Sequence, residues 1–404
     1  MEAVKLIAVF VFIVIALRLK ISVGVTLFLA GVITALMYNL KFLVLLEGYW
    51  ELIKSWRFIS LTLVIVLITI LGALLKELKF LDKLTEACGN LHGGNRTAVS
   101  ILPGLVGLMP MPGGALLSAP LVDNVLSDKK YSPEFKTVAN YWFRHIVEFF
   151  WPVYPGLILS AAITGVPLYR ISMLQFPLTV VMITLGIIFF SRKIDFINGK
   201  VGGTFLALKG IASTIWPIVL AIIIYGLFKI PLAFAVLIAM LLLIAIVRPK
   251  KESVFIALKQ GLTFKLVFLV FGILSFQTVL QLTGAINSIT KLTVDYKLPA
   301  ELVIFLVCFT SGLLTGMVAA FVGLSYSLLA GYLYQPQINI SHIFLAYLSG
   351  YIGMILSPTH LCLILTNEYF KSDLIKVYKK MLFPVMLLAL IGFLIYLSHW
   401  GELF

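Results

Sequence analysis

Long apolar segments separated by short polar connections make up nearly the whole chain. Most of them approach the roughly 20 residues that a helix needs to cross about 30 Å of hydrocarbon. The pattern predicts an all-α integral membrane protein. The predicted segments are 3–18, 22–40, 58–75, 97–122, 140–165, 171–190, 210–228, 230–247, 264–284, 302–334, 342–366 and 381–399.

Composition indicates the same class. Of 404 residues, 61% are apolar and 12% are charged, and the mean hydropathy is +1.09. A soluble domain of this size needs a more polar surface. The formal net charge of +14 fits basic residues gathered in cytoplasmic loops, so the predicted partner is the lipid bilayer and not nucleic acid. Cys88, Cys308 and Cys362 are scattered and odd in number, which predicts neither a disulfide nor a metal site.

The pattern repeats once, at a shift of about 207 residues. Apolar sequences match by chance too easily for a single match to decide, but several matches occur in the same order. They predict two repeats, 1–193 and 204–404, joined by a linker at 194–203. The matched pairs are Lys20 with Lys229, Lys83 with Lys291, Gly104 with Gly312, Met109 with Met317, Pro152 with Pro358 and Pro177 with Pro384.

The fourth apolar segment of each repeat differs from the others. In the first repeat it holds three prolines and four glycines between Ile101 and Ser118, which a single straight helix does not tolerate. It is too short for two full crossings, so two half-length helices are expected to meet at Pro110–Gly114. The predicted elements are re-entrant hairpins at 97–126 and 302–334 and broken helices at 140–165 and 342–366.

Loop charges favour the hairpins. If both fourth segments return to their own side, about three quarters of the 31 Lys and Arg residues lie on one side of the membrane. Each repeat then crosses five times, and because five is odd the second repeat is inverted. The prediction is a multi-pass protein of a prokaryotic cytoplasmic (inner) membrane, with about ten transmembrane helices, two hairpins and both termini outside the cytoplasm.

Inverted repeats with interrupted helices are typical of alternating-access transporters, which bind solutes where the repeats meet. Two hairpin tips and two helix breaks are expected to converge where the two repeats of this chain meet. Helix N-termini at such interruptions suit an anion, and freed carbonyls suit a cation such as sodium. The alternative is that the prolines only kink packed helices. The symmetric pairing of the breaks argues against this alternative. The interruptions are 109–115, 151–155, 315–323 and 357–360.

Glu148 lies just before the first break and four residues after Arg144. An intramembrane carboxylate indicates a proton or cation site, whereas an ion pair with Arg144 on the same helix face indicates simple neutralisation; both readings stay open. Arg144 is expected near the cytoplasmic end of the helix and His145 at the interface. No Lys or Arg is then expected at mid-depth, so helix ends and polar side chains would hold an anion.

His360 follows the second break, in a stretch from Leu302 to Asn367 that has no Asp, Glu, Lys or Arg. It could donate to an anion or carry a proton, and a satisfied structural histidine is the alternative. Tyr154 and Trp151, at the first break, are expected to pack more than to bind. Neutral hydroxyls at comparable depth come from Thr315, Ser357 and Thr359.

The repeat pattern resembles the ion transporter superfamily, which includes sodium-coupled dicarboxylate carriers and sodium/proton carriers. Pro103–Pro120, with its Met-Pro-Met-Pro-Gly-Gly core, and Arg144–Pro155 resemble a prokaryotic family in that group known only as integral membrane proteins of unknown function. The resemblance implies a homodimer, a scaffold made of the first two and the sixth segments of each repeat, and a moving domain of hairpins and broken helices. In dicarboxylate carriers, Ser-Asn-Thr tips hold carboxylate and sodium; this chain has Met109–Gly114 and Met317–Phe321 there.

Together these observations predict a secondary active transporter of a small organic anion, a carboxylate, with elevator-type movement and Na⁺ or H⁺ as the coupling ion. No cofactor and no metal site are predicted. The residues predicted to bind substrate are Pro112, Gly113, Gly114, Ala115, Tyr154, Thr315, Ala319, Ala320, Ser357, Thr359 and His360. Those predicted to hold the coupling ion are Met109, Pro110, Glu148, Trp151 and Ser357.

Two alternatives remain. A cation/proton antiporter needs an essential carboxylate, for which Glu148 is the candidate. An intramembrane enzyme or assembly factor would turn over a lipid or peptide without solute flux. The sequence has no Gly-Lys-Ser/Thr phosphate loop, no His-Glu-x-x-His and no Gly-x-Ser-x-Gly, so enzymatic activity is not predicted.

Topology tests the hairpin prediction directly. Lys83 precedes the first hairpin in the sequence and Ser127 follows it. Single cysteines that replace these two residues are expected to react with an impermeant thiol reagent from the same face of the membrane. Labelling from opposite faces would mean that 97–126 crosses the bilayer, and the inverted symmetry would be lost.

Overall fold

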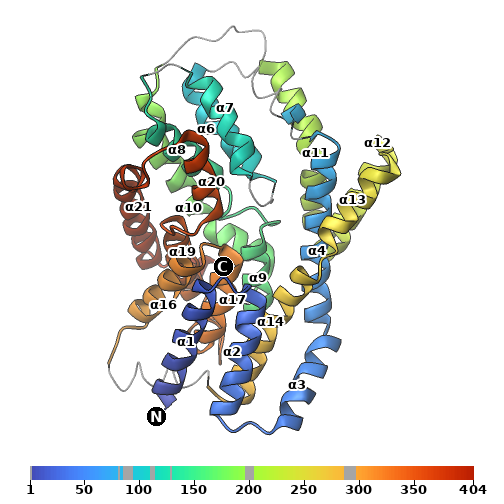
Figure 1. The fold of residues 1–404 in the computed structure, drawn as a ribbon, viewed down its shortest axis with the longest axis vertical. Helices are drawn as coiled ribbons and strands as arrows, with labels where there is room; N and C mark the ends of the chain where they lie inside the picture. Colours follow the sequence, from blue (N-terminus) through green and yellow to red (C-terminus); the bar gives the residue numbers. More distant parts are fainter. Residues whose placement is uncertain are drawn as a thin grey trace.

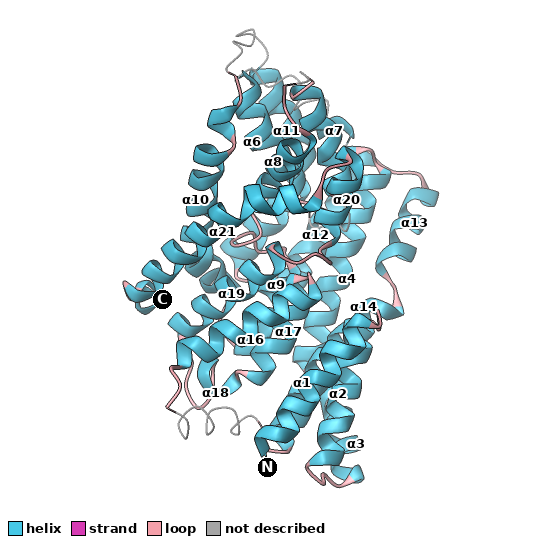
Figure 2. Ribbon diagram, turned by 60° about the vertical axis from the view of Figure 1, so that its left-hand side comes forward, coloured by secondary structure: helices cyan, strands magenta, loops and turns pink. Residues whose placement is uncertain are grey.

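The computed structural model describes residues 2–80, 82–84, 94–109, 114–127, 130–195, 204–285 and 297–404. Every regular element in these ranges is a helix (Figure 2), as the apolar pattern predicts. The first half of the chain forms α1 (Glu2–Arg18), α2 (Val23–Met37), α3 (Phe42–Lys54), α4 (Trp56–Glu77), α6 (Gly94–Gly107), α7 (Ala115–Val125), α8 (Pro133–His145), α9 (Pro155–Thr164), α10 (Leu168–Phe189) and η1 (Ser191–Lys193).

The second half forms helices in a corresponding order. The interrupted helices and the short α7 and α17 recur at equivalent places in the two halves. The second-half helices are α11 (Thr204–Phe228), α12 (Leu232–Val247), α13 (Lys251–Gly261), α14 (Phe264–Leu282), α16 (Ala300–Thr315), α17 (Val318–Leu328), α18 (Ala330–Leu333), α19 (Ile340–Ile355), α20 (Leu361–Phe370), α21 (Leu374–Leu397) and η2 (Trp400–Leu403).

Apolar side chains cover the outside of the bundle as well as its core. Phe264 is 78% exposed and Leu227 is 73% exposed, which suits contact with lipid rather than water. The chain is therefore a helical membrane protein. The number of ten crossings stays a prediction from the sequence. Among the described residues, five stretches are long and apolar enough to span a bilayer: Trp56–Glu77, Leu168–Lys193, Leu208–Phe228, Lys251–Leu282 and Leu374–Leu397.

Several helices of each half pack against a helix of the other half, and their counterparts make the reciprocal contact. The α2 helix packs against α14, and α12 packs against α4. In the same way α7 packs against α20, and α17 packs against α9. The core is therefore built jointly by the two halves of the chain, and neither half buries its apolar faces without the other.

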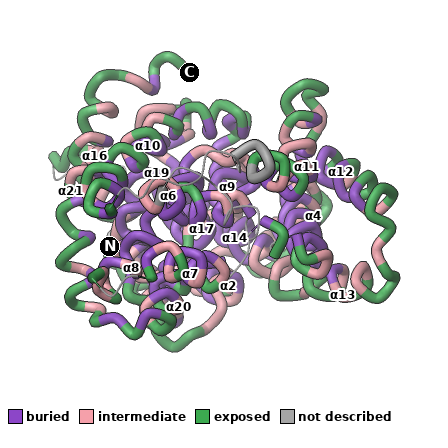
Figure 3. Tube along the Cα trace, turned by 90° about the horizontal axis from the view of Figure 1, so that it is seen from above, coloured by how far each residue is buried: buried purple, intermediate pink, exposed green. Residues whose placement is uncertain are grey.

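Two groups of helices are visible in the bundle. In one, α6 to α10 pack with α16 to α21; the other contains α1 to α4 and α11 to α14. Buried residues gather in the centre of the first group, while α4, α11, α12 and α13 lie to one side (Figure 3).

The sixth segment of each half belongs to the first group, not with the first two segments as the resemblance implies. The α10 helix packs against α21, and α21 packs against α8 and α19. Trp142 donates a hydrogen bond to Met182 O at 2.9 Å. A Cβ on Gly186 would lie 2.8 Å from the Trp142 Nε1, so this glycine lets α10 accept the ring.

Glycines set the closest helix crossings. A Cβ on Gly272 of α14 would lie 2.0 Å from Gly24 O of α2, and one on Gly312 of α16 would lie 2.0 Å from Gly350 O of α19. Small residues at such crossings let backbones approach, and van der Waals packing then stabilises helices that gain little from the hydrophobic effect in lipid.

We expect Gly272→Ala to lower the melting temperature in detergent by several degrees, because its methyl group meets rigid backbone; overpacking of this kind costs about 1–3 kcal/mol. Gly226→Ala in α11 is the control, since a Cβ there meets nothing within 4 Å and alanine favours the helix. Equal melting temperatures for the two variants would contradict the crossing.

Candidate functional site

Both interrupted helices break near the middle of the molecule. The first break separates α8, which ends at His145, from α9, which begins at Pro155; the second separates α19, which ends at Ile355, from α20, which begins at Leu361. Prolines in the breaks lack the N–H that a continuing helix needs. The α6 and α7 helices approach this region from one end of the molecule, and α16 and α17 approach from the other (Figure 1).

Side chains of the first break bind the end of α6. The Trp151 Nε1 donates to Leu108 O at 3.0 Å, and the Tyr154 hydroxyl donates to Gly107 O. The last carbonyls of a helix have no partner within it. Trp151 and Tyr154, which the sequence suggested would pack, therefore also cap the first helix pair.

The second break binds the end of α16 in the same way. The Ser357 hydroxyl donates to Leu313 O at 2.6 Å, and His360 Nδ1 lies 2.6 Å from Gly316 O. Thr359 Oγ1 lies 2.8 Å from Ser357 Oγ. The hydroxyls predicted to face a substrate are thus engaged with the tip of the second helix pair.

Four helix N-termini begin in this region, those of α7, α9, α17 and α20. None of them has a side-chain cap. The N-terminus of a helix carries a partial positive charge and unpaired N–H groups. The region is therefore electrostatically suited to an anion. The N-cap residues are Gly114, Tyr154, Met317 and His360.

Arg144, expected near the cytoplasmic end of the segment, is buried here in the last turn of α8. It is 2% exposed, and Glu148 is 7% exposed. Arg144 Nη1 donates to the Tyr154 hydroxyl at 3.0 Å and lies 3.6 Å from Glu148 Oε1. The guanidinium occupies space left by Gly107, where a Cβ would lie 3.3 Å from Nη1. A positive charge therefore lies beside Tyr154, the N-cap of α9.

Two polar atoms of α8 have no hydrogen-bond partner among the described residues. They are Arg144 Nε and Asn140 Oδ1, and both are buried. Asn140 Nδ2 is paired, since it donates to Ala115 O at 3.3 Å and to Thr366 Oγ1 at 3.2 Å. A buried unpaired group carries a desolvation cost, which a bound solute with a polar group would remove.

His145, expected at the interface, is also buried, with no exposed surface. Its Nε2 lies 3.0 Å from His360 Nε2, and the two ring centroids are 4.9 Å apart. The donor atoms of these two histidines and Cys362 lie within 4.8 Å of one another. Two imidazoles from different halves of the chain therefore face each other in the cluster.

The structure places the remaining predicted residues around this cluster. Met109 follows α6 and is buried, and the Thr315 hydroxyl donates within its own helix to Ser311 O at 2.8 Å. Gly114 and Ala115 begin α7, and Ala319 and Ala320 are buried in the first turn of α17. Pro110, Pro112 and Gly113 lie outside the described residues.

Asn140 and Tyr141 also belong to this cluster and were not predicted from the sequence. Asn140, Tyr141, Arg144, His145 and Glu148 follow a spacing that places them on one helix face. Such a polar stripe inside an apolar segment is the signal that could have located the cluster.

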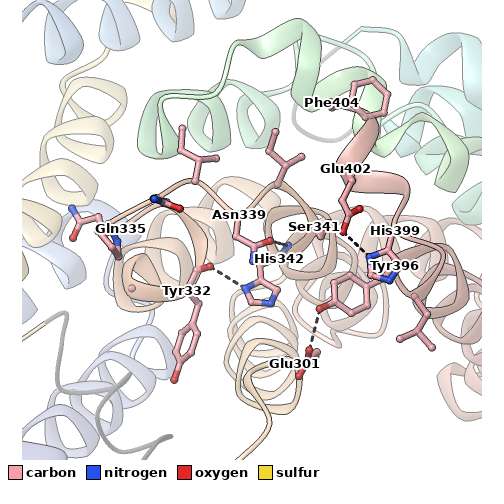
Figure 4. A pocket seen from close by; sticks show the side chains of 17 residues that line it. Glu301, Tyr332, Gln335, Asn339, Ser341, His342, Tyr396, His399, Glu402 and Phe404 are labelled. Atoms are coloured by element: carbon pink, nitrogen blue, oxygen red, sulfur yellow. Dashed lines mark hydrogen bonds and ion pairs between the residues drawn. The ribbon is translucent and has the colours of Figure 1, made fainter.

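A large cavity lies elsewhere, at the start of α19 and the C-terminal end of the chain (Figure 4). Its volume is about 800 Å³, and its lining includes Glu301, Asn339, His342, Tyr396 and Glu402. Arg144, His145 and Glu148 do not line it. All three side chains are buried among the described residues.

The fold and this cluster define a helical membrane protein with two broken helices that meet at a buried polar centre. The chain belongs to the family described as "protein of unknown function (DUF401)", whose sequence profile matches residues 3–398. No curated protein matches the chain.

Gly316 tests the contact between the tip and the break. Its φ is +61°, and a Cβ there would lie 2.8 Å from His360 N and 2.9 Å from Thr359 Oγ1. Gly316→Ala should therefore lower the melting temperature more than Gly165→Ala, because Gly165 shares the left-handed backbone, with φ +77°, and has open space around it. The left-handed conformation alone costs about 1–2 kcal/mol, and an equal loss in both variants would contradict the tip contact.

Proposed function

We propose that the protein is a secondary active transporter of a small organic anion, a carboxylate, coupled to sodium or protons. The observation that carries the proposal is the buried Arg144, whose guanidinium donates to the hydroxyl of Tyr154 at the N-terminus of α9. A guanidinium and helix N-termini both bind carboxylates well, the first through paired hydrogen bonds and the second through free N–H groups. The unpaired Arg144 Nε leaves a donor for a ligand.

The packing supports an alternating-access mechanism. Corresponding helix order and exchanged packing in the two halves are what a pair of two-fold-related repeats produces. Helix breaks at the meeting point of such repeats are typical of carriers with a central site. In this proposal α6/α7 and α16/α17 are the re-entrant hairpins, and they move with α8 to α10 and α19 to α21 as one transport domain.

The same proposal assigns the other helices to the scaffold. In this arrangement α1 to α4 and α11 to α14 stay fixed, in a homodimer, in a prokaryotic cytoplasmic membrane. The buried cluster is then an occluded site that opens to one side at a time. Residues of α8 and the two breaks bind the solute, and the family resemblance to the ion transporter superfamily is part of the same proposal.

A cation/proton antiporter is the second candidate, because Glu148 is a buried carboxylate. Its pairing with Arg144 at 3.6 Å counts against the antiporter, since the charge of Glu148 is already balanced. In liposomes, sodium–proton exchange without any organic anion that is abolished by Glu148→Gln would favour the antiporter. Turnover of a lipid or peptide without solute flux would favour an enzyme instead.

Arg144 gives the direct test. Carboxylates such as lactate, succinate and citrate, each with and without sodium, are screened for a rise in the melting temperature, because a ligand that binds only the folded state stabilises it. We expect Arg144→Gln to abolish the rise and to lower flux of the same anion in liposomes at least tenfold. Arg144→Lys keeps the charge but loses the planar fork, so it should fold and bind more weakly.

Arg170→Gln is the matched control, because Arg170 is exposed at the start of α10 and should leave both readouts unchanged. Wild-type protein that responds to no anion in either salt would count against the carrier.

A further inference from the structure

The two histidines of the cluster have their outer ring nitrogens fixed by backbone carbonyls. His145 Nδ1 lies 2.6 Å from Tyr141 O, and His360 Nδ1 lies 2.6 Å from Gly316 O. A carbonyl oxygen only accepts hydrogen bonds, so each Nδ1 must carry a proton. In a neutral imidazole the other nitrogen, Nε2, is then a bare acceptor.

These two Nε2 atoms face each other at 3.0 Å. Two bare acceptors at this distance repel each other, whereas 3.0 Å is a normal length for an N–H hydrogen bond. Because both tautomers are already fixed, a proton between the rings has to be an additional one. The pair then holds three ring protons and a single positive charge.

We propose that His145 and His360 share one exchangeable proton between their Nε2 atoms, and that this proton is the coupling ion of the transport cycle. The second half of this inference rests on the proposed anion transport. It assigns the coupling ion as a proton, and it places the proton on the histidine pair rather than on Glu148.

The charges around the pair fit this assignment. Glu148 Oε1 lies 3.9 Å from His145 Nε2 and 3.6 Å from Arg144 Nη1, so Arg144 and Glu148 balance each other. The shared proton then leaves a net charge of +1, which a bound monocarboxylate neutralises. Among the described residues, the other titratable groups packed around the cluster are Tyr141 of α8, Tyr154 of the first break, Tyr351 of α19 and Cys362 of α20.

The pair also joins the two halves of the protein. His145 is the last residue of α8 in the first half, and His360 precedes α20 in the second. His360 Nδ1 is in turn hydrogen-bonded to Gly316 O at the tip between α16 and α17. Loss of the proton would leave two facing lone pairs, so repulsion would push His360 and the Gly316 tip away from α8. Proton release is thereby linked to opening of the second helix pair.

Nitrogen NMR tests the shared proton without any substrate. The chain has five histidines, and protein labelled with ¹⁵N-histidine in lipid nanodiscs is titrated from about pH 5 to about pH 9. We expect one pair of Nε2 signals that shows coupling across an N–H···N bond and loses its proton in a single step. His360→Gln should remove this pair while its amide still donates to His145, which preserves packing.

His342→Gln is the control, because His342 lies in the cavity at the start of α19 and should leave the pair intact. Two independent proton losses would overturn the proposal. So would stoichiometric zinc or copper bound to His145 and His360 in the purified protein, found by elemental analysis.

Flux measurements separate the two proposals. If the wild type moves an anion with protons, His360→Gln should lose the pH dependence and the accompanying proton flux. An unchanged proton-to-anion ratio in this variant would overturn the coupling role and leave the carrier intact. Absence of any anion flux in the wild type would remove the carrier and the coupling role, while the NMR result would still decide whether the proton is shared.

Discussion

A helix that breaks inside a lipid-covered bundle has to satisfy its freed backbone groups from within the protein, and this requirement organises the centre of the molecule. Unpaired backbone groups cost several kcal/mol where no water is available. Here the breaks satisfy the carbonyl ends of α6 and α16, through Trp151, Tyr154, Ser357 and His360. Hydrogen bonds thereby hold each helix pair against a break.

The same constraint explains why charge lies beside the breaks. Burial of one ion is costly unless partners are close, and Arg144 has Glu148 and the Tyr154 hydroxyl within 3.6 Å. The hydroxyl of Tyr154 meets both the guanidinium and Gly107 O. The guanidinium, the first break and the end of α6 therefore form one hydrogen-bonded unit. A change in the charge of the cluster would alter the hydrogen bonds at the end of α6.

Local sequence signals predicted the elements well and the cluster only in part. Proline and glycine at fixed places predicted the interruptions, because they act on the backbone of their own segment. The same signals pointed to the polar and aromatic residues beside the breaks, because these residues are neighbours of the prolines in the sequence. They are Glu148, Trp151, Tyr154, Ser357 and His360. Arg144 and His145 were expected near the ends of the membrane span, and their burial in the bundle was not predicted, because burial depends on which helices surround α8. Their surroundings come from distant segments of the chain, which local patterns do not report.

The sequence by itself determined that the protein is helical, lies in a membrane and has two interrupted helices, since hydropathy and helix breaking are properties of neighbouring residues. Only the tertiary structure decided that His145 and His360, far apart along the chain, face each other at 3.0 Å. It also decided that α10 and α21 pack with the helix pairs. Such contacts depend on how the two halves exchange packing partners, and glycine crossings and aromatic side chains fix that arrangement in three dimensions.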